Sequence, residues 1–195
     1  IASNQDRAAL IQALSLAFQD DPALSWIVPD AERRQRGLPH LFSMIVPLDM
    51  ADGLALRSAG DEVATLWRAP GHAHISMMAM VMRVAPLLRA FGSALPRAMT
   101  VGDAIDAHHP RDIRYWYLHY VGARPDHQGK GWGGAAIRAG IARADAEGVP
   151  VFLETATLTN VGLYQSLGFQ ITAEWDVPKG GPHFWSMLRP VSQMD

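Results

Sequence analysis

Four glycines fall within the six residues from Gly129 to Gly134, and this stretch constrains the fold more than any other part of the chain. It follows a run with strand character, Ile113–Val121, and precedes a segment with small apolar residues at helical spacing. A glycine-rich turn between a strand and a helix leaves backbone N–H groups unpaired at the helix N-terminus, where they suit a phosphate. The turn therefore predicts a phosphate-binding site in an α/β fold.

Length and charge narrow the class of protein. The 195 residues predict one domain with one sizeable core, and the net charge of −2 leads us to expect neither nucleic acid nor membrane as a partner. The absence of cysteine excludes disulfide scaffolds and thiolate nucleophiles and favours a cytoplasmic protein. The most apolar stretch, Ile75–Leu88, is too short to span a membrane. Because the chain begins at Ile1, we expect that residues before it were removed or left out.

Two amphipathic helices are predicted before residue 50. Asp6–Phe18 places apolar side chains at helical spacing. Asp30 could cap a second helix, which we expect to be interrupted by Pro39 and to end near Pro47. The polar side of this second helix is predicted to be a solvated face and carries Arg33, Arg34 and Arg36.

A hairpin and a helical region are predicted next. Leu54–Arg57 and Glu62–Arg68 are short strand-like runs typical of an antiparallel hairpin. From Ile75 to about His109 the pattern is mostly helical, with breaks at Pro86, Gly92, Pro96 and Gly102. The methionines of this region either fill the core or line a pocket for an apolar substrate: Met77, Met78, Met80, Met82 and Met99.

The C-terminal half predicts one β-α-β unit and a terminal β-ribbon, which makes the fold mixed α/β. The expected elements are a strand at Ile113–Val121, helices at Gly131–Glu147 and Asn160–Leu167, a strand at Val149–Thr155, and ribbon strands at Phe169–Asp176 and His183–Leu188.

Three phosphate-binding motifs can be compared with the glycine turn. A P-loop needs a hydroxyl after Gly129-Lys130, but Gly131 follows. The dinucleotide fingerprint GxGxxG is matched by Gly129–Gly134, with Glu154 twenty residues after Gly134. However, the strand ends well before this turn, and too little chain follows Glu154 for a dinucleotide-binding oxidoreductase, which stays a less favoured alternative.

The third motif carries a family resemblance. Ala123–Gly131, with sequence ARPDHQGKG, resembles the V-x-P-x-x-Q-G-K-G block of the GNAT superfamily of acetyl-CoA-dependent N-acetyltransferases. Asn160–Phe169, with sequence NVGLYQSLGF, resembles the N-x-x-x-Y-x-x-x-G-F block of that superfamily. The resemblance covers about Tyr115 to Arg189. The ending and the region from Ala17 to Pro22 further resemble the puromycin N-acetyltransferase-like branch.

The resemblance implies a GNAT fold: a mixed, mostly antiparallel sheet with a splayed parallel strand pair, flanked by helices. It implies a single domain over residues 1–195, with an acceptor-side half at about 1–112 and an acetyl-CoA-binding half at about 113–190. Acetyl-CoA would be the co-substrate, and no metal is expected.

The resemblance also assigns the residues that would bind acetyl-CoA. Backbone groups of Val121 and Ala123, with Gly122 between them, would pair with the pantetheine arm. The pyrophosphate would lie on the amides of the turn, whose predicted contact residues are Gln128, Gly129, Lys130, Gly131, Trp132, Gly133 and Gly134. Asn160 would lie beside the pantetheine or its acetyl end.

Acetyl transfer to an amine needs a base, an acid and a group that polarises the carbonyl. The resemblance places Tyr164 as the acid, although an aromatic core residue would fit the same pattern. In a regular strand His119 shares one face with Val121, where it could be the base or simply a packed histidine. Glu154 is the alternative base, or it orients the amine. An N–H near Val121 or Gly122 would polarise the carbonyl.

The sequence thus predicts an N-acetyltransferase that joins acetyl-CoA and a small-molecule primary amine directly in a ternary complex. The amine is expected to have an apolar body, because the acceptor-side half offers Phe42, Met44 and Trp67. The alternative is a non-catalytic acyl-CoA-binding sensor or partner module. The terminal ribbon could support a homodimer. His72, His74 and the His108-His109 pair lack carboxylates at matching spacing, so we predict no metal site.

Overall fold

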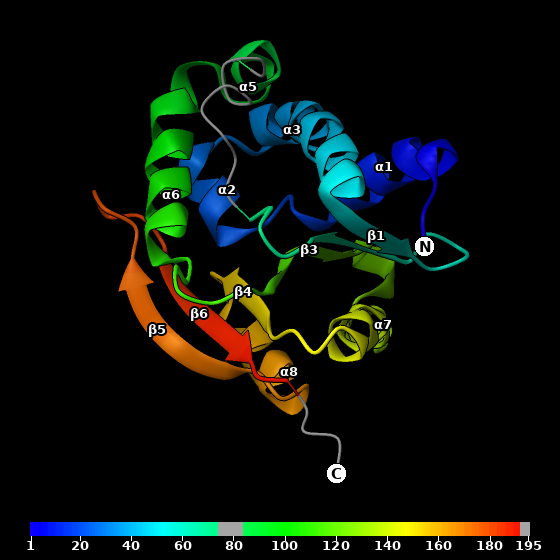
Figure 1. Ribbon diagram of the computed structural model, residues 1–195. Helices are drawn as coiled ribbons and strands as arrows, with labels where there is room; N and C mark the ends of the chain where they lie inside the picture. The colour runs from blue at the N-terminus through cyan, green and yellow to red at the C-terminus, as the bar shows by residue number, and fades with distance from the viewer. Residues whose placement is uncertain (74–83, 192–195) are drawn as a thin grey trace.

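The computed structural model describes residues 1–73 and 84–191. Within these ranges six strands form one sheet in the order β1-β2-β3-β4-β6-β5 (Figure 1). The strands are β1 (Gly53–Arg57), β2 (Val63–Arg68), β3 (Trp116–Ala123), β4 (Val151–Thr155), β5 (Gln170–Asp176) and β6 (His183–Arg189). Only β3 and β4 pair in parallel among these strands. The predicted mostly antiparallel sheet with one parallel pair is confirmed.

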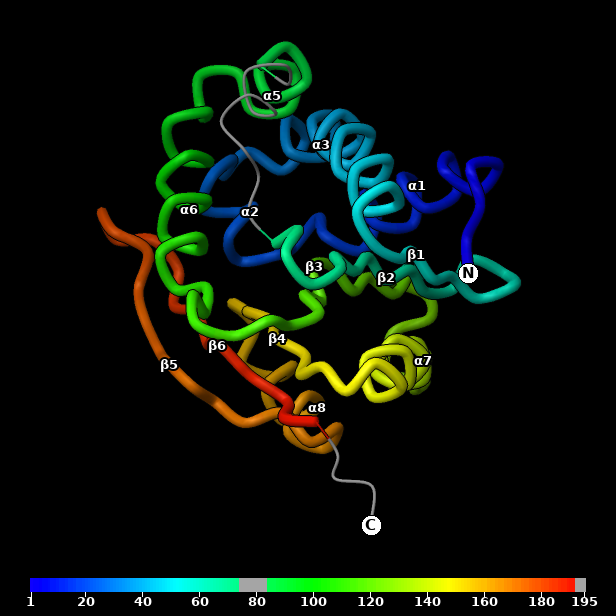
Figure 2. The backbone as a smooth tube through the Cα atoms, viewed as in Figure 1, coloured from blue at the N-terminus to red at the C-terminus, as the bar shows by residue number. Residues whose placement is uncertain are grey.

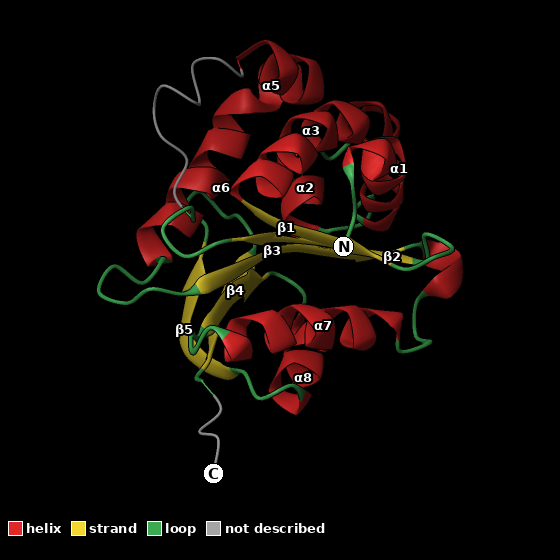
Figure 3. Cartoon of the chain, turned by 45° about the vertical axis from the view of Figure 1, so that its right-hand side comes forward, coloured by secondary structure: helices red, strands yellow, loops and turns green. Residues whose placement is uncertain are grey.

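Helices cover both faces of the sheet (Figure 3). One face carries α1 (Arg7–Ala17), α2 (Pro22–Ile27), α3 (Ala31–Asp52), α5 (Val84–Phe91) and α6 (Leu95–His108). The other face carries α7 (Trp132–Ala146) and α8 (Leu158–Ser166). Three 3-10 turns complete the described elements: Asn4–Asp6, Gly92–Ala94 and Pro125–His127. The larger core cluster lies under the first group of helices, and a second lies under α7 and α8.

Helix α3 is longer than predicted. It runs from Ala31 to Asp52 through both Pro39 and Pro47, although proline removes a helical hydrogen bond. The expected end near Pro47 is wrong, because the apolar stripe before it is followed by one more packed turn, in which Asp49 is fully buried and Met50 packs against the larger core. That stripe is Leu38, Leu41, Phe42, Ile45 and Val46, each at most 6% exposed. One more turn keeps Asp49, four residues after Ile45, on the same buried side.

Two of the three arginines at the start of α3 do not lie on the predicted solvated face, whereas Arg36 is exposed as predicted. Arg34 is only 8% exposed and donates hydrogen bonds to the carbonyl oxygens of Gln19 and Val28. Arg33 donates to the carbonyl oxygen of Phe91 at 2.6 Å. Unpaired carbonyls at the ends of neighbouring helices attract these cations, so Arg33 and Arg34 hold the helical layer together.

Short helix α2 was not predicted. Asp21 caps it by accepting a hydrogen bond from the Leu24 N–H at 2.9 Å, and Pro22 occupies its first turn. Asp21 and Pro22 follow the end of α1 and also begin α2. Because these residues are typical of a helix end as well as a helix start, the sequence pattern did not reveal α2.

Helix α6 passes through Gly102 without a break, whereas Pro96 lies in its first turn. The expected break at Gly102 is therefore wrong, and the one near Pro96 is a helix start. Of the five methionines, Met99 lies on α6, whereas Met77, Met78, Met80 and Met82 lie outside the described residues.

The parallel strands separate after a short contact. Only Trp116–Val151 and Tyr117–Phe152 pair between β3 and β4, yet β3 continues to Ala123 and β4 to Thr155. On its other side β3 stays paired with β2 up to Ala123. The β3 edge that faces β4 is thus unpaired from Leu118 onward, which confirms the splayed pair.

A β-bulge lies at His119. Leu66 pairs with Tyr120 and Trp67 pairs with Leu118, so His119 is the additional residue on β3. Leu118 packs in the core beneath α7, whereas the Tyr120 ring lies 5.3 Å from that of Phe18 on the opposite face.

The bulge overturns the predicted alternation on β3. His119 contacts the rings of both Tyr117 and Tyr120, whereas Val121 packs against the core beneath α7. His119 and Val121 therefore do not share a face, because the extra residue at the bulge reverses the pleat after it.

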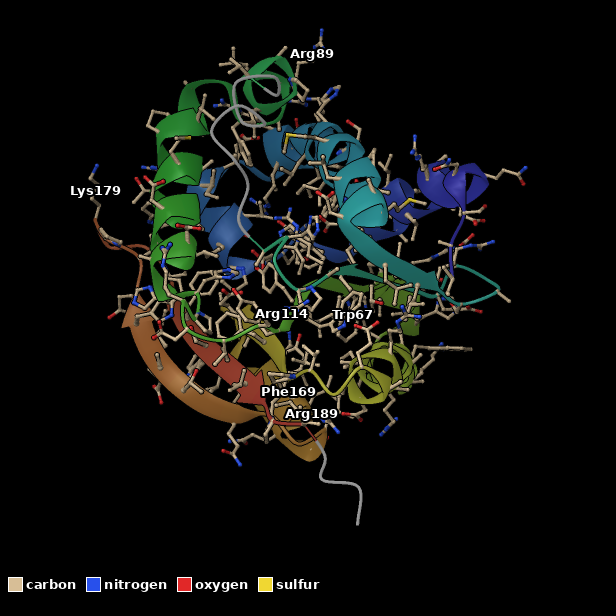
Figure 4. All side chains as sticks on the ribbon, viewed as in Figure 1. Trp67, Arg89, Arg114, Phe169, Lys179 and Arg189 are labelled. Carbon is tan, nitrogen blue, oxygen red and sulfur yellow. The ribbon has the colours of Figure 1, made fainter. Side chains whose placement is uncertain are left out.

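The Trp67 side chain fixes α7 against the sheet (Figure 4). Its indole is fully buried, and a Cβ built on Gly140 of α7 would lie 2.1 Å from the ring. The start of the chain lies along the outer edge of the hairpin, where the Ala2 N–H donates to the carbonyl oxygen of Ala55 in the edge strand β1 (Figure 2). These contacts hold β1 and β2 in place beside β3.

Candidate active site

A cavity of about 820 Å³ lies between the sheet and the helices of the larger layer. Its far wall is mainly apolar and comes from α2, α3, α5 and α6, with Leu24, Met44, Phe91 and Ala98 among the lining residues. Its near wall comes from the separated ends of β3 and β4 and from α8. The predicted acceptor residue Met44 lines it, but Phe42 and Trp67 are fully buried core residues.

His119 belongs to a buried triad at the near wall. Its Nδ1 lies 2.6 Å from Oδ2 of Asp49, and Arg68 Nε donates to Oδ1 of the same carboxylate at 2.7 Å. Asp49 is fully buried and the Arg68 side chain is 5% exposed. The three residues come from α3, β2 and β3, which the larger core brings together.

The triad fixes the protonation state of His119. Burial and the neighbouring Arg68 guanidinium lower the pKa of His119 below its usual value. Burial alone would raise the pKa of Asp49, but its contacts with His119 and Arg68 outweigh burial and lower it. A carboxylate only accepts hydrogen bonds, so neutral His119 donates from Nδ1 and keeps a lone pair on Nε2. His119 is therefore arranged as a general base.

Glu154 lies in a second buried group on the same wall. Its side chain is 3% exposed, and Oε1 lies 2.9 Å from His109 Nε2. His109 Nδ1 in turn lies 2.7 Å from the Tyr115 hydroxyl. Burial and the Glu154 carboxylate raise the pKa of Tyr117 well above its usual value, so Tyr117 stays protonated.

Tyr164 and Asn160 line the cavity from α8. Tyr164 is 7% exposed, and over the described part of the chain no residue is hydrogen-bonded to its hydroxyl. Burial raises its pKa above the usual value, so the phenol keeps its proton at neutral pH. A neutral, unpaired phenol beside the opening can donate a proton.

The glycine turn lies outside this cavity and leads into α7. Gly129 and Gly131 have φ values of 72° and 82°, and side chains built there or at Gly133 would meet nothing within 4 Å. No side chain caps α7, so its first N–H groups are available to an anion. Gln128 and Lys130 donate to the carbonyl oxygens of Ala123 and Asp126 and so brace the loop. These features fit a diphosphate.

The candidate metal-binding histidines separate in the structure. His72 faces Asp52 at 3.6 Å, His108 stacks on Trp175, and His109 faces Glu154. His74 lies outside the described residues. In residues 1–73 and 84–191, no three histidines or acidic residues are grouped to hold a metal ion, and no helix could span a membrane.

The strands β3 and β4 separate beside the cavity. His119, Glu154 and Tyr164 line the cavity at this opening, whereas the glycine turn at the start of α7 lies outside the cavity. Such a division suits a CoA-dependent acetyltransferase, because a thioester arm has to pass from a phosphate site to the reacting groups. The single parallel strand pair, by contrast, does not suit a doubly wound dinucleotide-binding sheet.

Comparisons with known proteins also point to an acetyltransferase. Residues 101–169 match the model of the acetyltransferase (GNAT) family. An uncharacterized N-acetyltransferase of Schizosaccharomyces pombe is 28% identical over 165 residues, a match that spans 78% of this chain and 66% of the relative, just under two thirds of its length.

Two solved structures share the fold. The histone acetyltransferase HPA2 and related acetyltransferase from Corynebacterium glutamicum matches 99% of this chain and 95% of its own, with 24% identity and a TM-score of 0.73. Arylalkylamine N-acetyltransferase 2 from Aedes aegypti matches 98% and 97%, with 14% identity and a TM-score of 0.72. Residues 101–169 are thus similar to the GNAT acetyltransferase family, and the whole chain has the fold of these two solved structures. The resemblance to the puromycin branch stays a prediction.

The cavity brings together the predicted residues His119, Val121, Glu154, Asn160 and Tyr164. Sequence reasoning missed two of the partners that hold them: Asp49 and Arg68. Asp49 could have been identified from the sequence, because an acidic residue within an apolar helical stripe needs a buried partner.

Proposed function

We propose that this protein transfers the acetyl group of acetyl-CoA to the primary amine of a small molecule with an apolar body. The observation that carries the proposal is the one cavity that joins an apolar far wall to His119, Tyr164 and Asn160 at the opening between β3 and β4. Bound acetyl-CoA supplies the acetyl thioester.

The residues of the chain move the protons. His119, oriented by Asp49, takes a proton from the amine as its nitrogen bonds to the acetyl carbon. Tyr164 gives its proton to the sulfur as the carbon–sulfur bond breaks, which returns the thiol. A backbone N–H on the unpaired edge of β3 is available to the carbonyl oxygen. The net reaction moves one proton from the amine to the sulfur; His119 then releases its proton to solvent, Tyr164 regains one from solvent, and no covalent enzyme intermediate is needed.

The apolar wall predicts the acceptor. Thiol release should be measured with acetyl-CoA and either phenethylamine or spermidine. We expect kcat/KM to be at least about tenfold higher for phenethylamine, because burying extra ammonium groups against apolar side chains is costly. A preference for spermidine would contradict the predicted acceptor class.

Tyr164→Phe separates catalysis from mere binding. Loss of the acid should lower kcat by about 10²-fold while leaving the acetyl-CoA dissociation constant unchanged. Acetyl-CoA binding without thiol release by the parent protein, for any amine tested, would instead indicate a non-catalytic binding module.

A further inference from the structure

Helix α1 packs against β3 at a position where β3 has no side chain. A Cβ built on Gly122 would lie 2.8 Å from the Cβ of Ala17 in the last turn of α1. It would also lie 3.0 Å from Cδ2 of Leu14 and 3.3 Å from Cε2 of Phe18. Non-bonded carbon atoms normally lie about 3.5–4.0 Å apart. A side chain at residue 122 and the present position of α1 therefore exclude each other.

The backbone at Gly122 does not itself require glycine. Gly122 pairs with Ala64 of β2, and its φ lies outside the left-handed region that favours glycine. Alanine could adopt the same strand conformation. A glycine inside a strand often marks the close approach of another part of the protein, and here that part is the end of α1.

The close approach of α1 sets the position of Phe18 in the cavity. Phe18 ends α1 and lines the cavity, as does Tyr120 of β3. The Phe18 ring lies 5.3 Å from that of Tyr120 and 5.6 Å from that of Phe42. Because Tyr120 and Gly122 are two residues apart on β3, both lie on the face that α1 covers. The distance between α1 and Gly122 therefore controls the distance between the rings of Phe18 and Tyr120.

Helix α1 is the partner that would move if residue 122 carried a side chain. β3 stays paired with β2 as far as Ala123, so its backbone is held on that side. The Cβ of Ala17 is fixed to the helix backbone and cannot rotate away. Restoring an ordinary contact between the two Cβ atoms needs a shift of the last turn of α1 by roughly 1 Å. Such a shift widens the space between Phe18 and Tyr120.

We propose that Gly122 limits the width of the acceptor by letting α1 hold Phe18 close to Tyr120. Gly122 does not line the cavity itself, so it is a positioning residue that acts through Phe18. The same contact also fixes the start of the apolar wall, because the N–H of Asp21, which caps α2, donates to the carbonyl oxygen of Phe18 at 3.3 Å. The inference rests on the proposed function and identifies what sets its selectivity for the acceptor body.

The test compares two acceptors that differ in the width of their ring system, phenethylamine and naphthylethylamine, by thiol release from acetyl-CoA. In Gly122→Ala, the ratio of kcat/KM for naphthylethylamine to that for phenethylamine should rise by about tenfold, as is typical when an apolar pocket changes by one methylene. This ratio is measured within one protein sample, so partial misfolding does not affect it.

Two results with Gly122→Ala would be informative in other ways. An unchanged ratio, with or without weaker acetyl-CoA binding, would overturn the inference while leaving the proposed function intact. No thiol release by the parent protein with either amine would instead contradict the proposed function.

Ala17→Gly provides a matched rescue, because it removes the atom that lies nearest to the added Cβ. Alone, this substitution should leave the ratio of the two acceptors unchanged. Combined with Gly122→Ala, it should bring the ratio most of the way back, since the remaining close contacts are with the ends of the Leu14 and Phe18 side chains. A ratio that stays raised in the double variant would show that contact with α1 is not the cause.

Phe18→Leu tests the same wall without crowding β3. Leucine is smaller than the ring that faces Tyr120, so the ratio should rise as it does in Gly122→Ala. An unchanged ratio in Phe18→Leu would show that Phe18 does not limit the width of the acceptor and would overturn the inference.

Discussion

Asp49 determines the tautomer of His119. The Asp49 carboxylate accepts the hydrogen bond from Nδ1, which leaves Nε2 as the basic nitrogen. A buried acid on an apolar helix face is costly unless it is paired, and Asp49 is paired with both His119 and Arg68. The catalytic role that we propose for a β3 residue therefore depends on a side chain supplied by α3.

Asp49→Asn should lower kcat/KM by about 10²-fold or more, because an amide can donate to His119 and favour the wrong tautomer. Asp52→Asn is the matched control on the same helix, since Asp52 is half-exposed and its carboxylate lies 3.6 Å from His72. Steady-state thiol release measures both variants. Equal activity of the two would show that Asp49 does not position the base.

The pH profile tests His119 directly. A base acts only when it is unprotonated, so activity is lost as pH falls through its pKa. Because burial and Arg68 lower the pKa of His119, kcat/KM should hold down to pH values below the ordinary histidine pKa of about 6.5 before it falls. With the parent protein and His119→Ala compared on one amine, an acidic limb that persists unchanged in the variant would exclude His119.

At the scale of elements, the order and type of most strands and helices followed from periodicity and turn residues, whereas two local details did not. Pro47 predicted a helix end, but packing of the α3 stripe outweighs the lost hydrogen bond, and the extra turn buries Asp49. The bulge at His119 arises from the register with β2, which no local pattern on β3 specifies.

The glycine turn makes a separate prediction. Gly131 and Gly148 flank α7, both have positive φ, and a Cβ at either would meet nothing within 4 Å. Alanine at either position should cost about 1 kcal/mol of stability for the same backbone reason. Only Gly131→Ala should also weaken acetyl-CoA binding, by about tenfold, as measured by calorimetry. Equal affinities for the two variants would remove the turn from the binding site.

At the scale of the whole molecule, the fold could be predicted because the glycine turn and the Asn160–Phe169 block are local motifs, and the acetyl-CoA-binding half stays a prediction from the same motifs. The acceptor side could not, because its wall is assembled from five helices and the end of the sheet, far apart in sequence. Tertiary packing alone brings Arg68, His119 and Glu154 to one cavity and places Asp49 behind them, and local motifs carry no information about it.

Initial rates of thiol release, with acetyl-CoA and phenethylamine both varied, test most directly whether this cavity joins the two substrates. Direct transfer requires both to be bound at once, so double-reciprocal lines should intersect and thiol release should depend on the amine. Parallel lines, which indicate an acetylated enzyme intermediate, or thiol release that is independent of the amine, would contradict the account.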